Sequence, residues 1–445
     1  MTASTGHSPV RRRVVLAVCC CLAAAILGIA FIVVPNFRTG EAPLRHVVAT
    51  VPDSGQVSLH LILGMPPADA GLAHYVEHLA WLNSVANPGK GNARHSNAWT
   101  GEISVGYWLD GEPQDLDEML ETLSNIFAPI DLPRKFAEEE RNIIQREYER
   151  SIAGNIDARA DEAMNEFLYR NNQIATSLIG TPNAIMAFEY DDARALHAAT
   201  HRPGNTTLVA IGDVTERQVL RALRKLKLPE PRDDVAKIGL PQFELAAPTE
   251  TVLHFPSPDA TRRMIWRRVI ELETPVQFDL LEAQTALLRD ILDTSLPGGL
   301  AGPLRFDAFV ARNLDIGVWP IDENNVEMRL TAIPDSDVTF SELRSEFEDT
   351  LNEIAVKGLP HTTFSRILDR FDGFWPDWDD KDETANWMAD YAFDRISLLR
   401  EPLPKSELKL LAGELSLETT NDLLRRLSGE GRTAVALIGL EDLVE

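Results

Sequence analysis

The longest uninterrupted apolar stretch of the chain lies close to its first residue. Residues 14–34 read VVLAVCCCLAAAILGIAFIVV and contain no charged side chain. As a helix, this stretch would be about 31 Å long, which matches the hydrocarbon core of a bilayer. Three arginines at 11–13 precede it, and basic residues mark the cytoplasmic end of a membrane span. We therefore expect a membrane-spanning anchor at 14–34, with residues 1–13 in the cytoplasm.

A cleaved signal peptide is the alternative interpretation of the same stretch. Signal peptides usually have a shorter apolar run that ends in small residues, whereas this run ends in FIVVP. The sequence therefore favours an uncleaved single-pass anchor and a short linker at 35–44. The body of the protein is then expected on the extracytoplasmic side of the membrane.

The rest of the chain alternates short β-branched runs with segments of helical periodicity, in two sets. In the first set we predict strands at 45–52, 57–65, 102–111 and 206–214, and helices at 71–86, 115–127, 133–152, 156–169, 191–201 and 214–226. In the second set we predict strands at 262–272, 314–319, 326–332 and 433–440, and helices at 276–296, 340–356, 363–371, 381–399 and 415–427. Residues 228–249 are rich in proline and charge, which is typical of an interdomain linker.

The two sets resemble each other and indicate an internal duplication. TTLVAIGDV closes the first set, and TAVALIGL closes the second. The predicted fold class is α+β, with two related α/β-sandwich halves that form a clam-shell. Each half is expected to have a mixed or antiparallel sheet with helices on one face. The predicted domains are an N-terminal domain at 45–227 and a C-terminal repeat at 250–445.

Charge and cysteine content narrow the chemistry of this body. The chain has 43 Lys and Arg against 68 Asp and Glu, so its formal net charge is −25. Such a charge repels nucleic-acid backbones and attracts cations or basic peptides, so we expect no nucleic-acid partner. All three cysteines lie at 19–21, inside the predicted anchor. The body therefore has no thiolate metal ligand, cysteine nucleophile or disulfide.

One motif in the helix predicted at 71–86 is typical of metal chemistry. It reads HYVEH at 74–78, an H-x-x-E-H pattern. His74 and His78 are four residues apart and so lie on one helical face, where both imidazoles can reach one zinc ion at about 2.0–2.1 Å. Glu77 flanks that face, where it can reach a water at the metal. The alternative is a surface helix with two solvated histidines.

A catalytic zinc ion needs a third protein ligand. In a body without cysteine, that ligand must be His, Asp or Glu. The helix predicted at 133–152 offers Glu140 and Glu147, which are seven positions apart and so share a helical face. We interpret the neighbouring Glu138 and Glu139 as solvated surface charges.

These segments together resemble the insulinase/pitrilysin family of zinc metallopeptidases. The blocks that carry the resemblance are GLAHYVEHLAW, NAWTGEISVGYWLDG, ERNIIQRE and RPGNTTLVAIGDV, in the family's order. The resemblance implies that His74, His78 and Glu147 bind Zn2+. It further implies that Glu77 is the general base and that Glu140 supports a metal ligand. The 69 residues from His78 to Glu147 are somewhat fewer than is usual in the family.

The resemblance also implies where a peptide would bind. Asn97 and Ala98 match a segment beside the bound peptide, where an edge strand pairs with substrate backbone. Family members often supply an Arg and a Tyr from the second half, in the stretch PLRFDAFVARNLDIGVW. Arg305 is our candidate for the Arg, with Arg312 as the alternative, and the Tyr position falls on Ile316.

The function implied by the resemblance is that of a membrane-anchored zinc metalloendopeptidase. It would hydrolyse peptides or unfolded polypeptide segments through a zinc-activated water. Because the second half lacks the expected tyrosine, the alternative is a non-catalytic or partner-dependent family member that acts as a zinc-binding assembly or binding subunit. Chains with two such halves often pair, so a homodimer or heterodimer is expected. Zinc suits the ligand set best, although manganese or cobalt can substitute.

Overall fold

The computed structural model describes residues 43–65, 71–84, 95–170, 172, 177–229, 244–374 and 385–440. The predicted anchor at 14–34, its cytoplasmic flank at 1–13 and most of both predicted linkers lie outside the described residues. Within the described part of the chain, no helix combines the length and the apolar character that crossing a bilayer requires.

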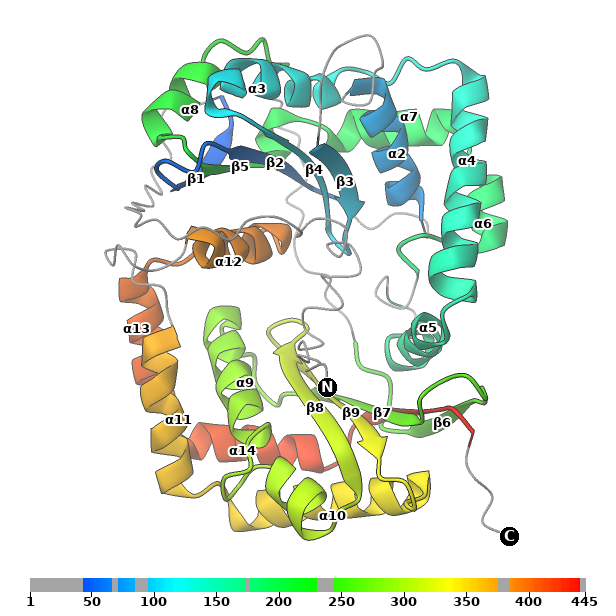
Figure 1. Cartoon of the computed structure of the whole chain (residues 1–445), viewed down its shortest axis with the longest axis vertical. Coiled ribbons are helices and arrows are strands. Elements are labelled where there is room, and N and C mark those ends of the chain that lie inside the picture. The colour runs from blue at the N-terminus through cyan, green and yellow to red at the C-terminus, as the bar shows by residue number, and fades with distance from the viewer. Residues whose placement is uncertain are drawn as a thin grey trace.

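Two five-stranded sheets with the same strand order form the frame of the protein (Figure 1). The first contains β1 (Arg45–Thr50), β2 (Val57–Gly64), β3 (His95–Thr100), β4 (Ser104–Gly111) and β5 (Thr206–Gly212), in the order β1-β5-β2-β4-β3. The second contains β6 (Glu250–Phe255), β7 (Arg263–Glu271), β8 (Ala311–Pro320), β9 (Asn325–Pro334) and β10 (Arg432–Ile438), in the order β6-β10-β7-β9-β8.

The pairing of strands is the same in both sheets. The first strand of each half runs parallel to the last strand of that half. All other neighbouring pairs are antiparallel. The predicted architecture of two related halves with mixed sheets is therefore confirmed.

The sequence pattern does not predict β3 and β6, which both lie at sheet edges. Neither strand contains a fully buried side chain, and both mix exposed with partly buried positions. An edge strand has one strand neighbour instead of two, so it needs no continuous apolar run. Its sequence therefore differs little from that of a loop.

The helices lie between and around the strands. Those of the first half are α2 (Leu72–Ser84), α3 (Leu116–Ser124), α4 (Arg134–Tyr148), α5 (Ile156–Leu168), α6 (Pro182–Ala187), α7 (Tyr190–Thr200) and α8 (Glu216–Leu223). Those of the second half are α9 (Phe278–Leu292), α10 (Phe340–Lys357), α11 (His361–Phe374), α12 (Ala385–Ser397), α13 (Lys405–Glu414) and α14 (Leu417–Ser428). The periodicity of the sequence does not predict α6 and α13.

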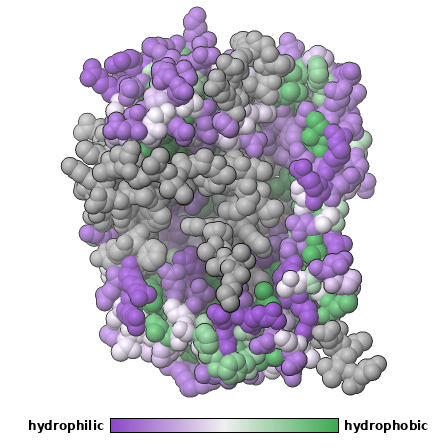
Figure 2. Space-filling model, in the orientation of Figure 1, coloured by the Kyte–Doolittle hydropathy of each residue, from purple (hydrophilic) through white to green (hydrophobic). Residues whose placement is uncertain are grey.

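Each sheet buries its outer face against helices of its own half. In the first half, Leu120 of α3 and Leu223 of α8 share a buried cluster with Leu61 of β2. In the second half, Phe347 of α10 and Leu424 of α14 share one with the strands β7 to β9. Hydrophilic residues dominate the coloured part of the face shown in Figure 2, as the charged composition predicts. Burial of these apolar stripes is the main term that holds each half together.

The inner face of each sheet is covered in part by a helix of the other half. α5 packs on β10, β6 and β7 of the second sheet, and α12 packs on β5 and β1 of the first sheet (Figure 1). Ala160 and Met164 of α5 share a buried cluster with Ala434, and Ala392 and Ile396 of α12 share one with the first sheet. The prediction of helices on one face only is wrong in this respect. The apolar stripe of a helix does not say which of two similar sheets it will cover.

A buried charge network joins α5 to the second sheet. The Arg267 and Glu327 side chains are fully buried, and Nε of Arg267 donates to Oε1 of Glu327 at 2.6 Å. The Tyr169 hydroxyl, just beyond α5, donates to the same carboxylate. Asp161 of α5 pairs with Arg329 at 3.1 Å. Buried charges are stable only when they are paired, so this network holds α5 on the sheet.

Candidate metal and catalytic site

Helix α2 carries the H-x-x-E-H motif and is fixed by its opposite face. Gly71, immediately before α2, has φ +81°, and a Cβ there would lie 2.5 Å from the Ile179 carbonyl oxygen, so only glycine fits. Tyr75, Val76 and Leu79 are buried in a cluster with residues of α4, α6 and α7. Packing of this face leaves the two motif histidines on the opposite side of the helix.

Helix α4 lies beside α2 and presents two carboxylates to it. Ala137 and Ile144 are buried against α2, and the Tyr75 hydroxyl donates to the Ala137 carbonyl at 3.0 Å. Glu140 and Glu147 lie next to the motif histidines. Immediately after α4 the chain makes a π-helical turn at Glu149–Ala153 and then enters α5.

His74, His78 and Glu147 converge at one point. The Nε2 atoms of the two histidines are 3.2 Å apart. Oε2 of Glu147 lies 3.8 Å from Nε2 of His74 and 3.5 Å from Nε2 of His78. Within the described residues, this is the one group of three or more His, Cys, Asp or Glu side chains close enough to share a metal ion. The structure thus brings together all three residues that the resemblance implies as ligands.

The dimensions of this triangle fit a small tetrahedral cation. Two ligand atoms that are each 2.0–2.1 Å from a tetrahedral zinc ion lie about 3.4 Å from one another. The three edges measured here, 3.2, 3.5 and 3.8 Å, are close to that length. Two imidazole nitrogens and one carboxylate oxygen also form a donor set that catalytic zinc uses. The residues present therefore fit the metal that the family implies.

Glu140 orients one of the two imidazoles. Its Oε2 lies 2.8 Å from Nδ1 of His78. A proton on Nδ1 that is donated to Glu140 leaves Nε2 of His78 facing the triangle. A carboxylate in this position fixes the tautomer and raises the basicity of a metal-ligating histidine.

Glu77 lies beside the triangle without being part of it. Its Oε2 is 3.7 Å from Nε2 of His74, and its side chain is 8% exposed. Thr100, the last residue of β3, donates its hydroxyl to the same oxygen at 3.0 Å. Burial raises the pKa of Glu77 to about 7, against the smaller opposing effects of His78 and Thr100. A carboxyl group with this pKa can both accept and return a proton near neutral pH.

The neighbouring groups hold the two histidines in different protonation states. Burial and the proximity of His78 lower the pKa of His74 to about 3. Burial also opposes the charged form of His78, but hydrogen bonds to Glu140 and Glu147 outweigh it and raise the pKa to about 10. The carboxylates around His78 thus favour positive charge at this point of the cluster.

Asn97 and Ala98 lie in the edge strand β3, next to α2. Asn97 is exposed, and Ala98 packs against the core of the first half. In the described part of the chain, β3 pairs with β4 alone, so its other edge has no strand neighbour there. Thr100 at the end of β3 contacts Glu77 beside the triangle, and the sequence pattern does not predict this contact.

The structure does not bring Arg305 into the cluster. Arg305 lies in a π-helical turn at Gly302–Asp307 that packs on α10, and its guanidinium is 5.3 Å from the ring centre of Phe306. Ile316 is buried in the core of the second half. Arg312 is exposed in β8. None of these three has a described contact with α2 or α4.

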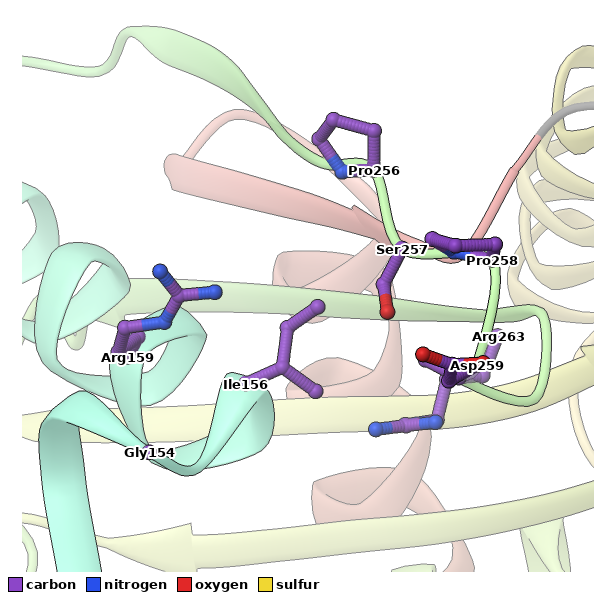
Figure 3. Close-up of a pocket in the computed structure, with 9 residues that line it drawn as sticks. Gly154, Ile156, Arg159, Pro256, Ser257, Pro258, Asp259 and Arg263 are labelled. Carbon is purple, nitrogen blue, oxygen red and sulfur yellow. The ribbon is translucent and has the colours of Figure 1, made fainter. Parts of the chain in front are cut away.

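A cavity of about 450 Å³ lies at the contact between α5 and the turn that joins β6 to β7. Figure 3 shows Ile156 and Arg159 on the α5 side, across from Ser257 and Asp259 of the turn. Nε of Arg263 in the wall donates to Asp157 at 2.7 Å. His74, Glu77, His78 and Glu147 do not line this cavity. It lies where α5 packs on the second sheet.

Part of the sequence matches a known protein family. Residues 65–182 match the insulinase family, peptidase family M16. This match contains three of the four sequence blocks, and the resemblance to the family is confirmed.

Three relatives show the extent of the similarity. The mitochondrial-processing peptidase subunit beta of Caenorhabditis elegans is 25% identical over 162 residues, which are 35% of this chain and 35% of that protein. The periplasmic protease PqqL from Escherichia coli has a TM-score of 0.73 at 14% identity, covering 93% of this chain and 48% of that one. An inactive domain of this peptidase family from Pseudomonas fluorescens has a TM-score of 0.68 at 14% identity, covering 92% and 97%.

The matches differ in how much of each protein they cover. The two structures share the fold with this chain, and the match spans about a third of the mitochondrial subunit and about half of PqqL.

Proposed function

We propose that this chain is a zinc-dependent endopeptidase that hydrolyses peptides or unfolded polypeptide segments. The observation that carries the proposal is the triangle of His74, His78 and Glu147, with the buried carboxyl group of Glu77 beside it. The family match over residues 65–182 supports the same conclusion. Such a ligand set leaves a coordination position open, as catalytic zinc sites require.

Each residue of the site has a distinct task in this proposal. His74, His78 and Glu147 would hold the ion, which when bound supplies a Lewis acid that polarises a carbonyl group and acidifies water. Glu77 accepts a proton from the attacking water and returns it to the leaving amine. Glu140 keeps the Nδ1 proton on His78, so that Nε2 stays available.

The substrate would bind as an additional strand on β3. An extended peptide can pair with the exposed edge of a sheet, and main-chain hydrogen bonds then hold it without regard to its sequence. Asn97 and Ala98 would lie beside that peptide. The net charge of −25 favours basic over acidic peptides, because it attracts them to the protein at low salt.

We further propose that the protein is anchored by residues 14–34, with its body on the extracytoplasmic side. The support is the uncharged apolar run and the three arginines before it. A partner chain is also proposed, because one relative is named as a subunit of a processing peptidase.

Zinc affinity should rise with pH. In the metal-free protein, the pKa of His78 is raised to about 10, so at pH 7 both ring nitrogens carry a proton. The proton on Nε2 must leave before this atom can bind zinc. Release of one proton predicts about a tenfold gain in apparent affinity for each pH unit between 6 and 8. Competition with a fluorescent zinc indicator, corrected for the indicator's own protonation, would measure this. An affinity that does not change with pH contradicts the assigned ligands.

The proposal itself can be tested with the full chain purified in detergent. A mixture of internally quenched peptides, basic and acidic, would be incubated with the protein as isolated, after chelation, and after zinc is added back. We expect cleavage that chelation abolishes and zinc restores, with basic peptides cut faster at low salt. Cleavage that persists after chelation, or no cleavage in the presence of zinc, would refute the assignment.

A second candidate is a zinc-binding subunit without peptidase activity. Two observations favour it. Ile316, at the position where the family often has a tyrosine, is buried in the core, and Arg305 lies outside the cluster. The Pseudomonas fluorescens domain of the same fold is described as inactive, so the fold alone does not carry activity. Zinc bound with high affinity but without cleavage of any peptide would support this candidate.

A further inference from the structure

We infer that Thr100 is a positioning residue, which holds the carboxyl group of Glu77 toward the metal ligands and ties it to the strand that receives the peptide. The inference rests on the proposed function, because it assigns Glu77 the role of base.

The contact itself is partly buried. Oγ1 of Thr100 donates to Oε2 of Glu77 at 3.0 Å, and the same oxygen is 3.7 Å from Nε2 of His74. Among the described residues, Thr100 is the one that donates a hydrogen bond to the Glu77 carboxyl group. Since the glutamate side chain has three rotatable bonds, a fixed partner is needed to keep its carboxyl group in one place.

The Thr100 hydroxyl is well suited to hold another group. Thr100 ends β3 opposite Val105 of β4, and the turn that follows is closed by a hydrogen bond from Gly101 N to Ser104 O at 2.7 Å. A β-branched side chain has few χ1 rotamers, so the hydroxyl is rigid as well as close. Helix α2 also packs directly on β3.

This geometry links substrate docking to the orientation of the base. A peptide that adds to the free edge of β3 would contact the strand that carries Thr100. Ordering of β3 by that peptide would also order the hydroxyl group that holds Glu77. The kcat for hydrolysis should depend on Thr100, whereas zinc binding should not, because Thr100 contacts none of the three ligand atoms.

Two substitutions separate the hydroxyl group from the shape of the side chain. Thr100→Val keeps the volume and the branching but removes the donor, and Thr100→Ser keeps the donor. We expect Thr100→Val to lower kcat about 10–100-fold, as loss of a hydrogen bond to a charged group predicts. KM, zinc affinity and thermal stability should stay within about twofold or a few degrees of the wild type. Thr100→Ser should restore most of kcat.

A second readout does not depend on peptide cleavage. In crystal structures of the zinc-loaded full chain, the Glu77 carboxyl group should occupy one rotamer in the wild type and leave it in Thr100→Val. The inference is overturned if Glu77 keeps its position in Thr100→Val, or if Ser and Val lower kcat equally. A wild type that binds zinc but cleaves nothing would refute the proposed function, and the rotamer of Glu77 would still decide the role of Thr100.

Discussion

Replacing Glu77 with Gln should lower kcat for peptide cleavage by about 10²–10⁴-fold while zinc remains bound. The amide has the shape of the carboxyl group and can accept the hydrogen bond from Thr100, but it cannot take a proton from water. None of the three ligand atoms is changed. Steady-state kinetics on a quenched peptide, together with zinc content by mass spectrometry, would measure both effects.

A matched control is available on the neighbouring helix. Glu139 is exposed on α4, where it pairs with Lys135 at 3.5 Å. Glu139→Gln removes the same charge from the same half and should leave kcat unchanged. Turnover close to that of the wild type in Glu77→Gln would remove Glu77 from the mechanism, and loss of zinc in that variant would assign it to the metal site.

Truncation of Arg267 should lower the free energy of unfolding by about 3–5 kcal/mol. Arg267 and Glu327 both have fully buried side chains, so Arg267→Ala leaves the Glu327 carboxylate without its cation in a dry interior. The Tyr169 hydroxyl still contacts that carboxylate, but a neutral donor does not neutralise the charge. Chemical denaturation followed by circular dichroism would measure the change.

Two further variants test the cause of this loss. Arg425→Ala breaks an ion pair with Asp422 whose side chains are both more than half exposed, and it should cost no more than about 1 kcal/mol. The double variant Arg267→Met and Glu327→Leu removes both charges at once and should recover most of the stability. If the double variant is as unstable as Arg267→Ala, lost packing rather than an unpaired charge is the cause.

The local parts of the candidate site follow from the sequence. Helical geometry places residues four apart on one face, so His74 and His78 had to converge wherever α2 packed. The same periodicity placed Glu140 and Glu147 on one face of α4. Sequence periodicity alone could not show that these two faces meet, because that depends on how α2 packs on α4.

The more distant parts could not be predicted from periodicity. The apolar stripes of α5 and α12 fit either sheet equally well. The sequence therefore does not predict that each helix packs on the sheet of the other half. Thr100 lies in an edge strand that reads as a loop, so its contact with Glu77 carries no sequence signal. Side chains alternate along β8, so Ile316 points into the core, and a tyrosine there could not reach the substrate side.

The turn between α4 and α5 places a mechanical constraint on the metal site. Glu147 lies two residues before this turn, and α5 beyond it is tied to the second sheet by the ion pair between Asp161 and Arg329. Any rotation of one half against the other that moves α5 relative to α4 would have to be absorbed between Glu149 and Asn155 or be passed on to the carboxylate of Glu147. In the second case, the motion that rotates the halves would also displace one of the three residues that would hold the cation.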